Sequence, residues 1–275
     1  MIGHSENVVR HYSAVHLTQK IADIMSHTLP NDRPLTVKDL APIDQFHTRG
    51  IAATVELARL AEVNQHTRVL DAGCGLGGPA RYLAATYDCT VLGVDLSPDF
   101  IDAAKYLSTR SGLIDRTDFQ VGDALNLPAD GGAFDLVWMQ HVAMNIADRD
   151  RLYREIHRVL RPGGRLALFD VVARDGEIHF PVPWSRTPET SFLLSSAQTR
   201  YALATVGFAV LEWIDDTDLA KAWFRELAAS PPTPGGASLG VAMGADFPEL
   251  VRNLGRNLAE GRVGTLSAVL ERAAL

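Results

Sequence analysis

A glycine-rich segment after a short apolar run is the feature that most restricts how this 275-residue chain can fold. Residues 68–71 read as a strand, and Gly73, Gly75 and Gly78 follow in the spacing G-x-G-x-x-G. A helix is expected immediately afterwards, at 80–87. This order of strand, glycine turn and helix is typical of loops that let a ligand approach the backbone closely. We therefore expect an α/β sheet with a ligand site at this turn.

The rest of the chain alternates in the same way between short apolar runs and amphipathic segments. Strands are expected at 68–71, 90–94, 118–121, 133–139, 165–172, 208–215 and 264–275, and helices at 80–87, 98–111, 148–160, 199–205 and 247–259. Strands that alternate with helices indicate right-handed crossovers and a parallel sheet with helices on both faces. The predicted fold is a Rossmann-like, mostly parallel sheet of seven strands. Its last strand follows a long insertion and is expected to be antiparallel.

The segments outside this sheet divide the chain. Residues 1–64 are expected to form a helical N-terminal cover, with helices at 8–25 and 48–63, and residues 65–275 the main domain. Insertions at 173–198 and 217–262 are expected to cap the substrate site. Residues 227–245 carry no charge, but their prolines and glycines predict a loop rather than a membrane helix.

Composition excludes several classes of protein. The net charge is −7, from 26 basic and 33 acidic residues, and there is no run of Lys or Arg, so we expect no nucleic-acid partner. Cys74 and Cys89 are too few for a disulfide framework and do not stand at zinc spacing. No secretory signal is visible at the N-terminus. The expectation is a cytoplasmic protein with no membrane partner, and a homodimer is the one assembly considered.

Acidic residues near the glycines separate two nucleotide ligands. Asp95 lies 20 residues after Gly75, at the end of the second strand, where a carboxylate can accept both ribose hydroxyls. That position also suits a nicotinamide dehydrogenase. Asp71, however, stands two residues before Gly73 and would oppose a pyrophosphate. It suits a ligand with an ammonium group and no phosphate, such as S-adenosylmethionine, and Asp123 with the N–H of Ala124 can read an adenine edge.

Five ordered pieces of sequence extend this pattern over about residues 65–215. They are Val-Leu-Asp-Ala-Gly-Cys-Gly-Leu-Gly-Gly (69–78), Gly-Val-Asp-Leu-Ser (93–97), Gly-Asp-Ala-Leu (122–125), Phe-Asp-Leu-Val-Trp (134–138) and Arg-Pro-Gly-Gly (161–164). With them the chain resembles class I S-adenosylmethionine-dependent methyltransferases. Flanking pieces at 44–47, 140–146 and 181–184 are similar to the small-molecule branch that includes sarcosine and dimethylglycine N-methyltransferases.

The resemblance implies roles for individual residues. Asp71 and Gly73 would lie by the methionine part of the donor, Asp95 at the ribose, and Gln140 near the sulfonium. The remaining donor-site residues that it implies are Cys74, Gly75, Gly78, Leu96, Asp123 and Ala124. Cys74 is expected to be a small buried residue rather than a nucleophile.

Candidates for the acceptor side are less specific. His141 is a possible base or a wall of the sulfonium pocket, Asn145 can orient a substrate, and Asp170 ends the fifth strand as an ammonium partner, a base or a loop cap. Related O-methyltransferases carry a histidine pair where this chain has Met144-Asn145, which argues against that mechanism.

Residues outside the sheet complete the set of candidates. Tyr12, Gln45, His47 and Trp184 are substrate-site candidates, each with ordinary packing or capping as the alternative. Arg174 and Arg186 are considered as carboxylate clamps. Asp170 has no adjacent acidic or amide partner, so no metal site is expected.

The expected function is transfer of a methyl group from S-adenosylmethionine to a small molecule, with S-adenosylhomocysteine as product. The resemblance slightly favours an amine nitrogen as acceptor. O- or C-methylation of a natural product, a non-catalytic S-adenosylmethionine-binding protein and a dehydrogenase are the alternatives.

Overall fold

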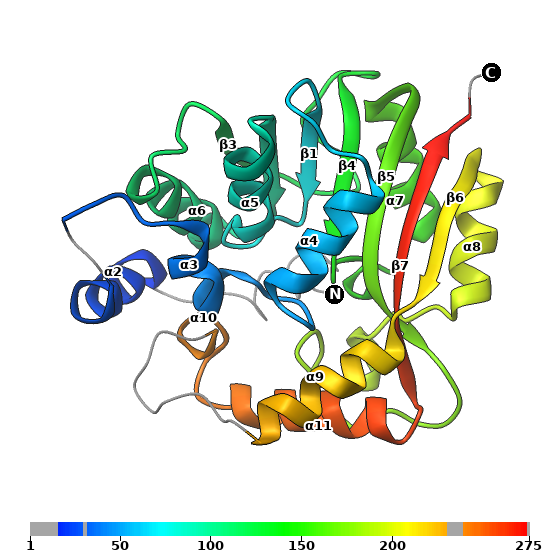
Figure 1. Cartoon of the computed structure of the whole chain (residues 1–275). Coiled ribbons are helices and arrows are strands. Elements are labelled where there is room, and N and C mark those ends of the chain that lie inside the picture. The colour runs from blue at the N-terminus through cyan, green and yellow to red at the C-terminus, as the bar shows by residue number, and fades with distance from the viewer. Residues whose placement is uncertain (1–15, 30–31, 230–238, 274–275) are drawn as a thin grey trace.

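The computed structural model describes residues 16–29, 32–229 and 239–273. Its centre is one seven-stranded sheet in the order β3-β2-β1-β4-β5-β7-β6 (Figure 1). The strands are β1 (Arg68–Ala72), β2 (Thr90–Asp95), β3 (Thr117–Val121), β4 (Phe134–Gln140), β5 (Leu160–Ala173), β6 (Phe208–Asp215) and β7 (Val263–Arg272). The helices are α2 (Leu17–Thr28), α3 (Val37–Asp44), α4 (Ile51–Leu60), α5 (Gly78–Tyr87), α6 (Pro98–Arg110), α7 (Arg149–Val159), α8 (Ser196–Thr205), α9 (Thr217–Ala229), α10 (Gly240–Met243) and α11 (Phe247–Ala259).

The direction of the strands agrees with the sequence. The neighbours among β1 to β5 pair in parallel, whereas β7 runs antiparallel to both β5 and β6. The predicted Rossmann-like sheet with an antiparallel last strand is therefore confirmed. Because the parallel strands all end at one edge, Asp71, Asp95 and Gln140 come to the same side of the sheet.

Two apolar layers hold helices on the two faces of the sheet. Alternate residues of the strands, such as Val69 and Trp138, pack with α4, α5 and α6 in one cluster. The intervening residues, such as Leu70 and Val137, pack with α7 and α8 in the other. Side chains of successive strand residues point to opposite faces, so both faces of the central strands are apolar.

The elements outside the sheet gather near its carboxyl edge. In Figure 1, α9 and α11 lie below the ends of the parallel strands, and α2, α3 and α10 lie beside them. A separate apolar cluster joins α9 and α11 to Met144 and Trp184. The two expected insertions, 173–198 and 217–262, therefore lie over the carboxyl edge of the sheet, the edge at which the glycine turn is found.

Several boundaries differ from the sequence-based expectation. The expected helix at 8–25 is described only from Leu17 and ends at Thr28, and the expected helix at 48–63 is α4. The helix α3 was not expected, since Pro42 lies inside it. The expected loop from 227 begins within α9, a helix that was missed, and contains the short α10. The expected strand at 165–172 begins at Leu160, so β5 includes the Arg-Pro-Gly-Gly piece.

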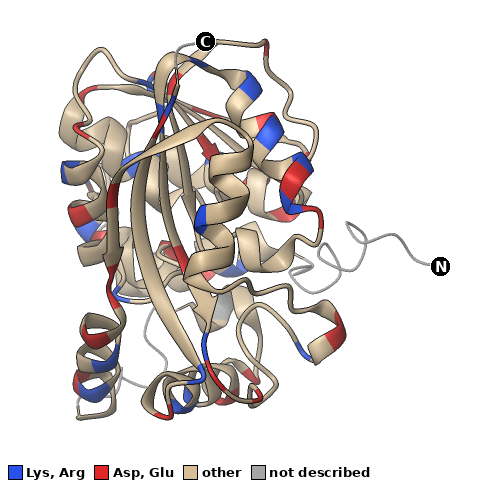
Figure 2. Cartoon of the chain, turned by 90° about the vertical axis from the view of Figure 1, so that its right-hand side faces the viewer, with Lys and Arg blue, Asp and Glu red and all other residues tan. Residues whose placement is uncertain are grey.

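The burial of the last strand also differs from what its alternating sequence suggests. β7 lies between β5 and β6, and eight of its ten residues are buried on both faces. Charged residues of both signs are interspersed on the outer helices (Figure 2). In the part of the chain that the structure describes, no helix is both long and apolar enough to cross a bilayer.

Candidate active site

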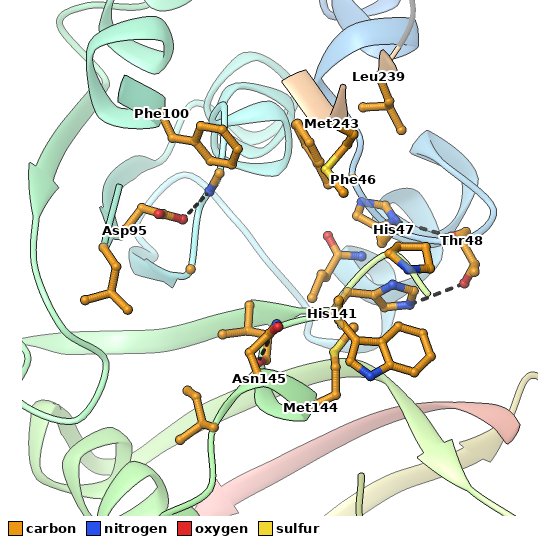
Figure 3. A pocket seen from close by; sticks show the side chains of 18 of the residues that line it. Phe46, His47, Thr48, Asp95, Phe100, His141, Met144, Asn145, Leu239 and Met243 are labelled. Carbon is orange, nitrogen blue, oxygen red and sulfur yellow. Dashed lines mark hydrogen bonds between the residues drawn. The ribbon is translucent and has the colours of Figure 1, made fainter. Parts of the chain in front are cut away.

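One cavity opens at the carboxyl edge of the sheet, between the glycine turn and the helices α9 to α11. Its empty volume is about 1330 Å³, with open solvent at the mouth included. In Figure 3, Asp95 lies near Phe100 on one side of the cavity, and His47, Thr48 and His141 lie together on the other. The polar and glycine residues that line it are His47, Thr48, Gly73, Gly75, Asp95, Gly122, Asp123, Gln140, His141 and Asn145. The apolar residues on the walls include Phe46, Leu96, Phe100, Ala124, Trp184, Trp223, Phe224, Met243 and Phe247.

The glycine turn owes its shape to three positive backbone angles. Gly73, Gly75 and Gly77 have φ of +77°, +52° and +75°, a region that side chains disfavour. A Cβ on Gly73 would lie 2.5 Å from a methyl carbon of Val142, so the first glycine also lets β4 and its loop pack against the turn. The N–H groups of Gly73 and Cys74 both donate to the carbonyl of Val94, at 2.7 and 3.1 Å. The turn is thereby fixed to the end of β2.

Asp95 connects the glycine turn to the next helix. One carboxylate oxygen accepts from the N–H of Gly75 and the other from the N–H of Ser97, both at 2.9 Å. Burial nevertheless raises the pKa of Asp95. The carboxylate is held rigidly at the cavity wall, beside Leu96, and its oxygens have further lone pairs for a ligand.

The loop after β3 supplies the next part of the wall. The carboxylate of Asp123 accepts from the N–H of Leu125 at 2.8 Å, and its carbonyl accepts from Asn126 at 2.8 Å. This tight turn brings Asp123 and Ala124 to the lining, as the sequence predicts for an adenine-facing edge.

Three residues of the predicted donor set lie behind the lining rather than on it. Asp71 is buried, and among the described residues its Oδ2 has no hydrogen-bond partner. Burial, together with the charge of Asp95, raises the pKa of Asp71 to about 8. Cys74 is buried next to Gly93, and burial raises its thiol pKa, which fits a filling role. The space beside Gly78 is filled by another part of the chain and not by the cavity: a Cβ there would lie 2.2 Å from the carbonyl oxygen of Asp44.

A buried polar network connects the N-terminal segment to the end of β4. The side-chain oxygen of Gln45 lies 3.0 Å from both His47 Nε2 and Thr54 Oγ1, and Thr54 also donates to Gln140 at 3.2 Å. Trp138 donates to the same Gln140 oxygen at 2.9 Å. In the described part of the chain, the buried Nε2 of Gln140 has no partner. Gln45 is thus a support for His47 and does not line the cavity, and Thr54 was missed from sequence because nothing near it marks a site.

His141 follows β4 in a left-handed backbone conformation, with φ of +54°. Its Nε2 lies 3.3 Å from the hydroxyl oxygen of Thr48, and its ring lies 5.1 Å from that of Phe169. Burial, with His47 nearby, lowers the pKa of His141 well below its usual value, and burial lowers that of His47 to about 4. Both rings are therefore neutral at pH 7. Thr48, a cavity residue, was not singled out from the sequence.

Asn145 and Asp170 differ in their access to the cavity. Asn145 lines it, and its side-chain amide donates to the carbonyl of Val142 at 3.2 Å. Asp170 is buried and does not line the cavity. Its carboxylate accepts from the backbone N–H of Val171 at 3.0 Å and from the N–H groups of Ala143 and Met144. Burial raises the pKa of Asp170 to about 7. Of the readings left open by the sequence, its contacts match those of a loop cap.

Trp184 lines the cavity, with its indole N–H donating to Ser191 at 2.9 Å. Arg174 pairs with Asp215, and Arg186 with Asp246, so both arginines are engaged away from the lining. Tyr12 lies outside the described residues. No group of His, Cys, Asp or Glu side chains with the geometry of a metal site occurs among the residues that are described.

At the Asp95 end of the cavity the residues present fit S-adenosylmethionine, and Gln140 Nε2 is a donor in the lining that has no partner among the described residues. Asp71, which was expected beside the ammonium group, lies behind the lining, and a pKa of about 8 leaves its carboxyl mainly protonated at pH 7. Asp95 offers a carboxylate for ribose hydroxyls, and Asp123 with Ala124 a polar edge for a base. This set contains no cation for a pyrophosphate.

Comparison with known proteins agrees with this geometry. A family described as "Methyltransferase domain" matches residues 70–168. Methyltransferase GfsG of Streptomyces halstedii is 39% identical over 136 residues, which cover 50% of this chain and 49% of that protein. Other relatives are named as O- or N-methyltransferases, and the chain spans only between 29% and 61% of the length of the curated relatives compared.

Solved structures share the fold over nearly the whole chain. The geranyl diphosphate C-methyltransferase from Streptomyces coelicolor superimposes with a TM-score of 0.72 at 18% identity, covering 99% of both chains. The [4+2]-cyclase SpnF superimposes with a TM-score of 0.68 at 24% identity, covering 99% of this chain and 97% of the other. At such identities the likeness shows the fold alone.

Proposed function

We propose that this chain, which carries a class I S-adenosylmethionine-dependent methyltransferase domain, transfers a methyl group from S-adenosylmethionine to a small-molecule acceptor. The observation that carries the proposal is the two-ended cavity. Asp95 and Phe100 lie on one side of it, and His47, Thr48 and His141 lie on the other. Aromatic and aliphatic side chains from α9 and α11 also line it. A donor and an acceptor can meet there out of water.

The donor is bound by groups that the fold holds in place. Asp95 accepts the ribose hydroxyls, Gly73 and Gly75 allow close backbone approach, and Leu96 packs on the adenine, whose edge Asp123 and Ala124 contact. Asp71 lies behind the turn and is mainly protonated at pH 7, so it makes no ion pair with the donor, whereas Gln140 donates from Nε2, which has no partner among the described residues. Cys74 and Gly78 support the turn: Cys74 fills space, and Gly78 lets α3 approach.

The donor supplies an already activated methyl group on a sulfonium, so the protein forms no covalent intermediate. Its residues align the acceptor with the methyl carbon and exclude water. His141 is neutral and accepts the proton that the acceptor releases. With the ring proton on Nε2, His141 donates to Thr48, and Nδ1 is then the proton acceptor. Asn145 orients the acceptor, Asp170 holds the turn that carries Asn145, and His47 stabilises the wall beside His141.

Some expectations from the sequence stay predictions. They are the domain division at residues 64 and 65 with caps at 173–198 and 217–262, a cytoplasmic location, a homodimer, the absence of a nucleic-acid partner, and an amine nitrogen as acceptor atom. The names of the relatives include both O- and N-methyltransferases, so they do not choose the acceptor atom.

One observation favours a second function, an S-adenosylmethionine-binding protein that transfers no methyl group. The chain shares its fold, over almost its full length, with a protein named as a [4+2]-cyclase. In that case the cavity would orient a substrate beside a bound donor that does not react. A dehydrogenase is disfavoured, because among the described residues no Lys or Arg lines the cavity to meet a pyrophosphate.

The deciding experiment has two stages. First, the melting temperature is measured with S-adenosylhomocysteine and with NADH; a rise with NADH alone would refute the methyltransferase. Second, radiolabelled S-adenosylmethionine is incubated with the protein and a broad panel of alcohols, amines and carbon nucleophiles. Labelled product supports methyl transfer, whereas donor binding without any labelled product supports the second function.

A further inference from the structure

The acceptor end of the cavity differs from its donor end in charge. We infer that the acceptor is an uncharged, mainly hydrocarbon molecule, and not an amino acid, a phosphate ester or an alkylammonium ion. The inference rests on the proposed function, since it concerns the second molecule bound in the same cavity.

The first observation is the chemistry of the wall. Three elements from the second half of the chain contribute to it: Trp184 from the loop after β5, Trp223 and Phe224 from α9, and Phe247, Val251 and Leu254 from α11. Trp184 and Leu254 are buried in the apolar cluster under α9 and α11. Such a wall binds a ligand by removing apolar surface from water, and it supplies few polar partners.

The second observation concerns charge. The ionisable residues in the lining are Asp95, Asp123, His47 and His141. Both carboxylates belong to the donor end, and burial keeps both histidines neutral. Within the described ranges, no Lys or Arg lines the cavity, so a carboxylate or phosphate would meet no counter-ion there.

The third observation is that three arginines near this wall, Arg149, Arg174 and Arg186, already have partners. Arg149, the buried cation under this wall, donates to the carbonyls of Ile146 and Phe192 at 2.9 and 2.8 Å and to the hydroxyl of Tyr153 at 3.2 Å. Arg174 and Arg186 are held by Asp215 and Asp246. Freeing Arg149 to clamp an anion would leave buried carbonyls without their partner. The pairs of Arg174 and Arg186 are solvent-exposed, and neither arginine lines the cavity.

The test uses three probes of equal chain length: 1-octanol, octanoate and octylammonium. Their dissociation constants are measured at neutral pH by calorimetry on protein saturated with S-adenosylhomocysteine. We expect octanol to bind at least about tenfold more tightly than either ion, because a buried charge without a partner is disfavoured. Equal or tighter binding of an ion, or no binding of octanol, would overturn the inference.

A charge-introducing variant provides the matched comparison. Val251→Lys places a cation in the wall and should reverse the preference, so that octanoate binds more tightly than octanol. Val55→Lys adds the same charge on α4, where Val55 is 43% exposed, and should leave all three constants unchanged. If V251K fails to favour octanoate while remaining folded by circular dichroism, Val251 does not face the acceptor.

Binding of S-adenosylhomocysteine is recorded separately for each protein. A wild-type protein that does not bind it refutes the proposed function. A protein that binds it and prefers an ionic probe refutes only the inference about the acceptor.

Discussion

The guanidinium of Arg81 lies 2.8 Å from the carboxylate of Asp44, and both side chains are almost completely buried. Arg81 belongs to α5, the helix that the glycine turn opens, and also donates to the carbonyls of Leu76 and Ala104. Asp44 ends α3 and is followed by Gln45, which supports His47. The pair therefore fixes the N-terminal segment against the loop that borders the donor end of the cavity.

Replacing Arg81 by Met should destabilise the protein strongly. Removal of one partner of a buried ion pair leaves an uncompensated charge, which costs about 3–5 kcal/mol. Urea denaturation followed by circular dichroism measures the free energy of unfolding. The control is Arg154→Met, which breaks the exposed pair with Asp150 and should change stability much less. Equal losses in the two variants would show that the buried pair has no special role.

Replacing Asp95 by Ala should weaken donor binding and leave the fold intact. Hydrogen bonds to a charged group contribute about 1.5–3 kcal/mol, so Kd for S-adenosylhomocysteine should rise about ten- to a hundredfold. Isothermal titration calorimetry measures this constant. Asp102→Ala, at an exposed position on α6, is the control. An unchanged Kd in D95A would remove Asp95 from the ribose role.

The sheet, and the meeting of the glycine turn with Asp95 at one edge of it, were largely predictable from the sequence, for a physical reason. Apolar runs followed by glycine or aspartate mark the ends of parallel strands, and all such ends meet at one edge. Gly73, Asp95, Asp123 and Gln140 therefore had to be neighbours once the strands were recognised. The boundaries of β2 and β6 follow from the same signals to within one residue.

Other parts depend on contacts that no local pattern announces. Thr54 and Gln140 are 86 residues apart in the chain, yet they share a hydrogen bond. Gly78 reads as a ligand-approach glycine, but the space beside it is filled by Asp44. The helix α9 was hidden by the proline- and glycine-rich stretch that follows it, although its own residues have a helical pattern. The acceptor wall comes from these segments, so it was the part least accessible to prediction.

His141 should be required for turnover but not for donor binding. Loss of a general base typically slows a reaction about a hundred- to ten-thousandfold, and we expect His141→Gln to lower kcat by that order once an acceptor is found. Thr48→Val should give a smaller loss, because it removes only the partner of Nε2. The radiolabel assay gives kcat, and calorimetry with S-adenosylhomocysteine gives the donor Kd. Thr205→Val, on the exposed end of α8, is the matched control. Full activity in H141Q would exclude His141 as the base.

Asp71 should make stability depend on pH. Burial raises the pKa of Asp71 to about 8, from an ordinary value of 3.8. Between these two values the folded protein keeps a proton that the unfolded chain has lost, so the folded state binds more protons and stability falls as pH rises. The free energy of unfolding of the wild type should therefore decrease, on the order of a few kcal/mol, from pH 4 to pH 8.

The variant Asp71→Asn cannot lose this proton and should remove much of that decrease. The remaining slope should include Asp170, whose pKa burial raises to about 7 and which still titrates in the variant. Urea denaturation at several pH values, for the wild type, D71N and D170N, separates the two contributions. The D170N curve should flatten mainly below pH 7, and the D71N curve up to pH 8. If D71N and the wild type have the same slope, the Asp71 carboxylate is stabilised in the folded protein and its orphaned oxygen has a partner.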